Sequence, residues 1–273
     1  MLTAEELVVT AEQKRQYREE GYMILEAVIP TDVLAMLREE CAYFLGYTDG
    51  RMDAQGKKSE GITHRGSRYF ISNQYRNSHR LWRFLFSDLM AQVARATLGP
   101  EAYLFHEQWV VKGPEQGMKF SWHQDSGYVK YGHKETTHKP YLTCWCPLDD
   151  VNEKNGTVYL LPHSRGGTRG QIIDHVMQAG SGDLVGYHGE DPGIPIIVPA
   201  GSIVAFTSYN FHRSGPNTSP NLRRVYLPQY SADQILRPDG SLWAMAVPVV
   251  KDGRNVYDHA TDAAERYGVK SHD

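Results

Sequence analysis

The sequence YLFHEQWVVK, residues 103–112, opens the part of the chain that decides the fold. It is rich in β-branched and aromatic residues, which are typical of strands. Similar short runs follow at residues 141–147, 157–161, 194–198, 202–207 and 223–230. Because glycine, proline and asparagine separate these runs, they predict an all-β body over about residues 101–232.

The residues before this body indicate helices. Thr10 and Gln13 have the spacing of a capping box that opens a helix, and Gly21 ends it. A short strand is expected at residues 22–25. Thr31 is expected to cap a second helix, because apolar residues recur at helical spacing up to Leu45. A third helix is expected at residues 87–97.

Two long polar stretches interrupt these patterns. Residues 48–77 are weakly periodic and are expected to form a loop or lid. Residues 166–192 are expected to form a second loop with a short helix at 172–178. The sequence thus predicts a mainly β fold with flanking helices, in one domain of residues 1–273. Its parts would be a helical front (about 1–100), a β body (about 101–232) and a C-terminal tail (233–273).

The composition is that of a globular protein without a strong charge. Hydrophobic residues make up 41% and charged residues 22% of the 273 residues, and the formal net charge is −3. No region has the basic excess that nucleic acid or an anionic membrane surface needs. The three cysteines are too few for a disulfide framework. We expect a soluble, cytoplasmic protein that binds neither nucleic acid nor membrane.

The tetrapeptide Trp122-His123-Gln124-Asp125 suggests a metal site. Side chains two residues apart on an extended segment point to the same side, so His123 and Asp125 can share a ligand. His212, which follows another strand series, is a candidate third ligand. Two neutral imidazoles and a carboxylate on one face of a metal leave the opposite face open, which is how oxygenases hold Fe(II).

These motifs occur together in one known family. The chain resembles the phytanoyl-CoA dioxygenase-like Fe(II)/2-oxoglutarate oxygenases over about residues 11–231. The shared elements, in the family's order, are Glu20-Gly21-Tyr22, the Trp122–Asp125 motif, Trp145, the Asn155-Gly156-Thr157 turn, Leu161-Pro162, His212 and Arg223. The chain departs from the family at the turn Pro162-His163-Ser164-Arg165, where the family usually reads Pro-Gly-Ser-His. The resemblance implies a double-stranded β-helix, or jelly roll.

The resemblance also implies the chemistry of the site. Its iron ligands would be His123, Asp125 and His212, with 2-oxoglutarate and O₂ as cosubstrates. The usual outcome is hydroxylation of a small molecule, with release of succinate and CO₂. Related halogenases lack a carboxylate at the position of Asp125, so this residue favours hydroxylation.

Arg223 is the expected partner of the cosubstrate's C5 carboxylate. A guanidinium binds carboxylate through two parallel hydrogen bonds and stays charged. Arg224 points the other way on the same strand, so only one of the two can reach the pocket. Ser214 and Gln108 are further candidates for contacts with the cosubstrate, and Trp145 resembles the family's tryptophan that lines its pocket.

Candidate substrate contacts lie in the variable loops: Arg68, Tyr128, His133 and Tyr187. This mixture of aromatic and basic groups is compatible with a small polar metabolite, including an anionic one. His106 and His163, at strand edges, are expected to be hydrogen-bonded structural histidines instead.

Two alternative functions fit the residues less well. A cupin-like Zn²⁺ or Mn²⁺ hydrolase or isomerase would keep the metal site, although structural zinc is normally closed by four ligands and only three are evident here. A non-catalytic, ligand-binding jelly roll would need no metal chemistry.

Overall fold

The computed structural model describes residues 8–114, 119–179 and 182–267. Its helices are α1 (Ala11–Glu20), α2 (Thr31–Ala54), the 3₁₀ helix η1 (Tyr75–Asn77), α3 (Trp82–Leu85), α4 (Asp88–Leu98), α5 (Asp125–Gly132), α6 (His163–Gly166) and α7 (His259–Tyr267). None of the described helices has the length and apolar character that crossing a membrane requires.

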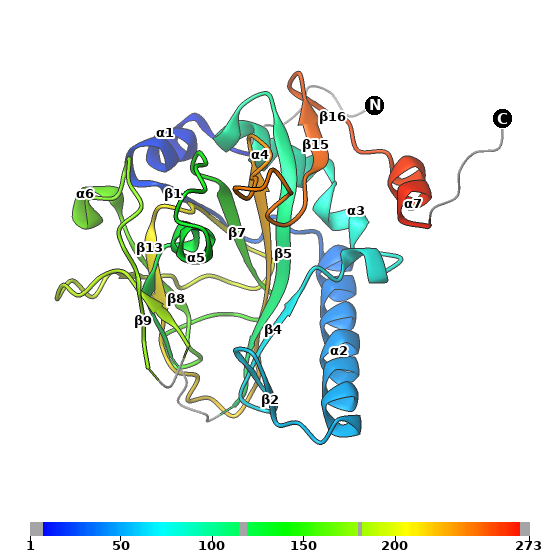
Figure 1. The fold of residues 1–273 in the computed structure, drawn as a ribbon, viewed down its shortest axis with the longest axis vertical. Coiled ribbons are helices and arrows are strands. Elements are labelled where there is room, and N and C mark those ends of the chain that lie inside the picture. Colours follow the sequence, from blue (N-terminus) through cyan, green and yellow to red (C-terminus); the bar gives the residue numbers. More distant parts are fainter. Residues whose placement is uncertain (1–7, 115–118, 180–181, 268–273) are drawn as a thin grey trace.

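The strands form a major sheet, a minor sheet and a small hairpin (Figure 1). The major sheet has the order β1 (Tyr22–Leu25), β12 (Ile203–Thr207), β7 (Leu142–Pro147), β14 (Arg223–Ser231), β5 (Ala102–Lys112), β4 (Arg68–Ser72), β3 (Thr63–His64), β2 (Ser59–Glu60), with β15 (Val247–Lys251) and β16 (Arg254–Asn255) attached. The minor sheet has the order β11 (Ile194–Pro195), β8 (Val158–Leu161), β13 (Phe211–Ser214), β6 (Phe120–His123). The hairpin pairs β9 (Val176–Met177) with β10 (Leu184–Val185).

The two sheets face each other, and the long helices cover the outer face of the major sheet (Figure 1). Every residue of β7 is buried because both of its faces are covered. Cys144 and Cys146 pack in the core that the helices cover, whereas Trp145 packs in the core between the sheets. This two-sheet arrangement confirms the predicted mainly β fold with a helical N-terminal part.

A bulge in β5 shapes the interior. The register with β14 shifts between Gln229, which pairs with His106, and Tyr230, which pairs with Leu104. Phe105 is therefore the extra residue, and Phe105 and His106 both line the same cavity instead of pointing to opposite faces. Bulges often aim side chains in this way beside functional sites.

Several local predictions are confirmed and others are wrong. The capping box of α1 is present, and Gly21 adopts φ 81° at its end. Thr31 is the first residue of α2 instead of its cap, and α2 continues to Ala54, into the expected loop. The rest of that stretch contains β2, β3, β4 and η1, and β4 joins these short strands to β5. Residues 172–178 form no helix, and part of them pairs as β9 instead.

Glu107 is a buried carboxyl on the helix-covered face of β5. Its Oε1 accepts a hydrogen bond from the backbone N–H of Tyr75 at 2.9 Å. Burial raises the pKa of Glu107 to about 7, against roughly 4.3 in an unfolded chain. Because the folded-state pKa is the higher one, this group's contribution to stability is complete below about pH 4 and is lost as pH rises through about 7.

We therefore predict that wild-type protein loses more stability between pH 5 and pH 8 than the Glu107→Gln variant, which keeps a neutral acceptor. The shift from roughly 4.3 to about 7 corresponds to roughly 4 kcal/mol at about 1.4 kcal/mol per pKa unit. Urea unfolding of both proteins at each pH measures the difference. Glu26→Gln, at an exposed position, is the control, and an identical pH dependence in wild type and Glu107→Gln would contradict the prediction.

Candidate active site

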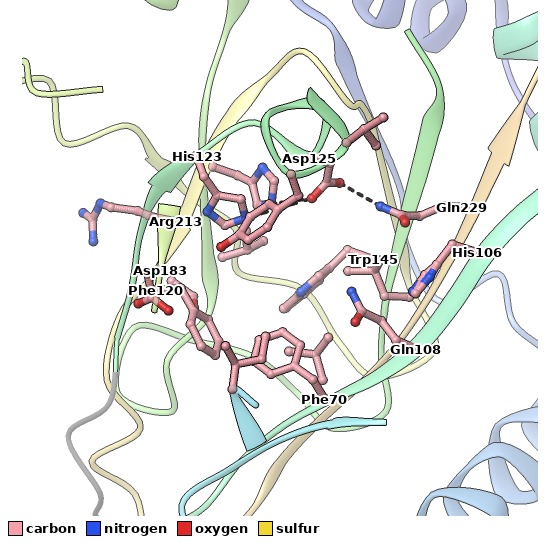
Figure 2. A pocket seen from close by; sticks show the side chains of 18 of the residues that line it. Phe70, His106, Gln108, Phe120, His123, Asp125, Trp145, Asp183, Arg213 and Gln229 are labelled. Carbon is pink, nitrogen blue, oxygen red and sulfur yellow. Dashed lines mark hydrogen bonds and ion pairs between the residues drawn. The ribbon is translucent and has the colours of Figure 1, made fainter. Parts of the chain in front are cut away.

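A cavity of about 230 Å³ lies between the two sheets (Figure 2). The major sheet contributes side chains from β4, β5, β7 and β14, and the minor sheet contributes side chains from β6, β8 and β13. Strand alternation explains which residues of β5 reach it: His106, Gln108 and Val110 line the cavity, whereas Trp109 and Val111 pack in the core under the helices. The predicted metal ligands lie in its wall.

His123, Asp125 and His212 come together as predicted. One ligand atom from each lies within 4.8 Å of the others, and no other described residues form such a group. His212 on β13 pairs directly with His123 at the end of β6. Asp125 is the first residue of α5 instead of a strand residue, but Gln124 before it is extended (φ −103°, ψ 139°). Asp125 therefore still points to the same side as His123.

Neighbouring groups hold these three side chains in position. The Nδ1 of His123 lies 2.8 Å from the carbonyl oxygen of Ser121, so Nδ1–H donates there and Nε2 keeps its lone pair. Burial and the nearby His212 lower the pKa of His123 to about 4, so the imidazole is neutral near pH 7. Asp125 Oδ2 accepts a hydrogen bond from the Thr143 hydroxyl at 2.5 Å. It also accepts one from the Gln229 amide at 2.9 Å (Figure 2).

This arrangement fits a metal with an open coordination face. Asp125 Oδ1 is directed at the histidines, 3.4 Å from His212 Nε2 and 4.0 Å from His123 Nε2. Two neutral imidazoles and one oriented carboxylate are the donor set that non-haem Fe(II) oxygenases use. The supporting contacts to Ser121, Thr143 and Gln229 are of the kind that tunes metal ligands.

Three buried basic residues lie side by side at one end of the interior, which we call the cationic end. Arg68, Lys112 and Arg223 are cross-strand partners on β4, β5 and β14, and each is 1% exposed. Arg68 forms an ion pair with Asp183 at 3.2 Å, and Lys112 donates to the carbonyl oxygen of Gly215. Burial, followed by the charges of Arg223 and Arg68, lowers the pKa of Lys112 well below its usual value.

Arg223 has unused hydrogen-bonding capacity at this end. Its Nε and Nη1 and the Ser214 hydroxyl are buried and have no hydrogen-bond partner among the described residues. Burial lowers the pKa of Arg223 to about 10, so the guanidinium stays charged near pH 7. Arg224 points the other way and binds Asp149. An unpaired buried cation is costly unless a ligand supplies the anion.

The structure places the other predicted site residues as follows. Trp145 and Gln108 line the cavity, with Arg223 over the Trp145 ring at 5.7 Å. Tyr128 lines it too and packs edge-on against His123. Arg68, His133 and Tyr187 are outside the cavity wall: Arg68 is paired with Asp183, and Tyr187 packs on Trp122 and Phe211.

Several residues of the cavity region were missed by sequence reasoning. Lys112 and His106 lie on the same face of β5 as Gln108, because strand side chains alternate between the two faces. Once Gln108 is known to face the interior, alternation therefore predicts that Lys112 and His106 face it too. His106, expected to be a hydrogen-bonded structural histidine, instead lines the cavity with its Nδ1 unpartnered. Tyr141 and Trp243 carried no sequence signal, because only the fold brings them to the cavity.

Comparison with known proteins agrees with this geometry. The ectoine dioxygenase of Bordetella parapertussis is 29% identical over 252 residues, which cover 84% of this chain and 78% of that protein. The human peroxisomal phytanoyl-CoA dioxygenase is 22% identical, covering 82% and 68%. The crystal structure of EctD from S. alaskensis with 2-oxoglutarate and 5-hydroxyectoine superposes with a TM-score of 0.68 at 19% identity, covering 91% and 88%.

The fold, the donor set and these similarities define a class of enzyme, the Fe(II)- and 2-oxoglutarate-dependent dioxygenases with a jelly-roll fold. The family model described as phytanoyl-CoA dioxygenase (PhyH) matches residues 17–225, more than half of the chain. The chain therefore belongs to the phytanoyl-CoA dioxygenase family. Its cofactor is iron and its cosubstrate is 2-oxoglutarate, so the hydrolase and the non-catalytic alternatives are set aside.

Proposed function

We propose that this enzyme hydroxylates a small molecule, with Fe(II) held by His123, Asp125 and His212 and 2-oxoglutarate anchored by Arg223. One observation carries the proposal. The three ligand atoms converge at the wall of a cavity that also contains a buried arginine with two unpartnered nitrogens. A metal ligand set and a carboxylate anchor in one cavity are what a 2-oxoglutarate dioxygenase requires.

Iron bound there would supply the centre at which O₂ is activated, with 2-oxoglutarate as the reductant that leaves as succinate and CO₂. The protein's own contribution is to hold the ligands and the cosubstrate. Thr143 and Gln229 occupy Oδ2 of Asp125 and leave Oδ1 for the metal. The retained carboxylate at Asp125 supports hydroxylation instead of halogenation.

The cationic end supports the role of Arg223. Its unpartnered Nε and Nη1 suit the two oxygens of a C5 carboxylate, and the Ser214 hydroxyl can donate a further hydrogen bond. Lys112 is its cross-strand neighbour on β5. A bound carboxylate would compensate the charge of Arg223, whose Nε and Nη1 have no hydrogen-bond partner among the described residues. Trp145 supplies an apolar wall beneath the guanidinium.

The Arg223→Gln variant should bind 2-oxoglutarate roughly ten- to a hundredfold more weakly, because charge-assisted hydrogen bonds contribute roughly 1.5–3 kcal/mol each. Anaerobic titration of the Fe(II) enzyme with 2-oxoglutarate, followed by the visible charge-transfer band, measures the affinity. Arg224→Gln is a matched control, because it changes the adjacent arginine on the opposite face. Equal affinities in the two variants would contradict the anchor role.

Gln229→Leu should lower Fe(II) affinity roughly ten- to a hundredfold, because groups that orient metal ligands typically contribute that much. Competition with a chelator of known affinity measures the loss. Gln55→Leu, at an exposed position, is the control. If Gln229→Leu binds Fe(II) like wild type, Asp125 does not depend on this contact for metal binding.

We also propose that the protein acts in the cytoplasm. Its three cysteines are free and buried, a state that a reducing compartment maintains. Fractionation of the native cells, with the protein detected by antibody, tests this assignment, and recovery from an oxidising compartment would overturn it.

A further inference from the structure

The cavity has a third part, which neither the metal ligands nor the cationic end explains. We call it the aromatic lobe and define it by Phe105, His106, Val129, Tyr141 and Trp243, all of which line the cavity. Phe105 stands at the centre of its apolar wall, with ring centroids 5.0 Å from Tyr141 and 5.5 Å from Trp243. The bulge in β5 brings Phe105 and His106 into this wall together.

The aromatic lobe lies at the far end of the strands from the proposed cosubstrate anchor. His106 pairs with Gln229, and Lys112 pairs with Arg223, at opposite ends of β5 and β14. The two pairs are roughly 20 Å apart along the strands, at about 3.3 Å per residue. A five-carbon cosubstrate held at Arg223 therefore leaves the lobe free. Gln229 also binds Asp125, so the lobe borders the metal centre.

His106 is the polar group of this lobe. It is partly exposed although it lies within a paired strand, and the surface that it lines is the cavity. Its buried Nδ1 has no hydrogen-bond partner, whereas buried polar atoms in native proteins nearly always have one. Burial lowers the pKa of His106 to about 4, so the ring is neutral near pH 7. It can therefore exchange a hydrogen bond with a ligand but offers no charge.

The charged residues of the interior lie elsewhere. Arg223 belongs to the cationic end, and Figure 2 shows Asp183 and Arg213 on the opposite side of the cavity from His106. The remaining charged side chain near the lobe, Asp125, is a proposed metal ligand. A charged group buried against Phe105 and Trp243 would lose its hydration without gaining an ionic partner.

We propose that the aromatic lobe binds the molecule to be oxidised, and that this substrate is uncharged, presents an apolar or flat face, and hydrogen-bonds to His106. The inference rests on the proposed function, because it takes the metal and cosubstrate to occupy the rest of the cavity. The sequence was compatible with a small polar metabolite, including an anionic one, in contact with loop residues, but Arg68 and His133 are outside the cavity wall.

Matched probes test the charge preference. 4-Methylbenzyl alcohol, 4-methylbenzoate and 4-methylbenzylamine share one ring and differ in charge at pH 7.5. Each is titrated anaerobically into the Fe(II)·2-oxoglutarate enzyme, with binding read from ligand-observed NMR and from the change in the visible band. The alcohol should bind at least tenfold more tightly than either charged probe. Equal binding, tightest binding of the benzoate or the amine, or no binding of the alcohol would overturn the proposal.

Variants of His106 test its role. His106→Leu should weaken the binding of 4-methylbenzyl alcohol roughly tenfold, because it removes one hydrogen bond. A tenfold change in affinity corresponds to about 1.4 kcal/mol, which is within the range of one hydrogen bond. Binding of p-xylene, which forms no hydrogen bond, should not weaken. His106→Gln should recover part of the alcohol affinity. His133→Leu, outside the cavity wall, is the control.

The visible charge-transfer band of the Fe(II)·2-oxoglutarate enzyme distinguishes a failure of the His106 proposal from a failure of the proposed function. If the band forms normally but His106→Leu binds the alcohol like wild type, the role of His106 is overturned and the proposed function stands. If wild-type enzyme gives no band with Fe(II) and 2-oxoglutarate, the proposed function itself fails.

Discussion

The carboxylate of Asp125 is the contact on which the rest of the site depends, because it joins the two sheets. Asp125 follows β6 of the minor sheet, but its Oδ2 is bound by Thr143 of β7 and Gln229 of β14 in the major sheet. His212 approaches its other oxygen from β13. The Asp125 carboxylate thus holds the metal-binding strands of the minor sheet at a defined position against the major sheet.

The cavity-facing residues of β5 and β14 then divide the interior by chemistry. Lys112 and Arg223 form a buried cationic end, and His106 and Gln229 form a neutral polar row beside the metal ligands. Between them lie apolar residues, including Val110 and Leu227. A single antiparallel pair therefore separates a carboxylate anchor from an aromatic lobe, with the metal ligands facing it from the minor sheet.

The agreement between sequence and structure is greatest where local physics is sufficient. The capping box at Thr10 and the alternation that separates Arg223 from Arg224 depend on neighbouring residues only, and both are present. The polar stretch at residues 48–77 was misinterpreted as a loop for the opposite reason. Its strands are short, and they join the major sheet through the pairing of β4 with β5, a contact between distant segments that local periodicity does not report.

The sequence by itself determined the class of this protein: its motifs, in their order, specify the family, the metal-binding residue types and the candidate anchor Arg223. The tertiary structure alone decided which side chains share the cavity. It excluded Arg68 and His133 from the cavity wall and brought His106, Tyr141 and Trp243 into it. The physical reason is that ligand motifs are local in sequence, whereas a cavity wall depends on strand register, on a one-residue bulge at Phe105 and on contacts between distant segments.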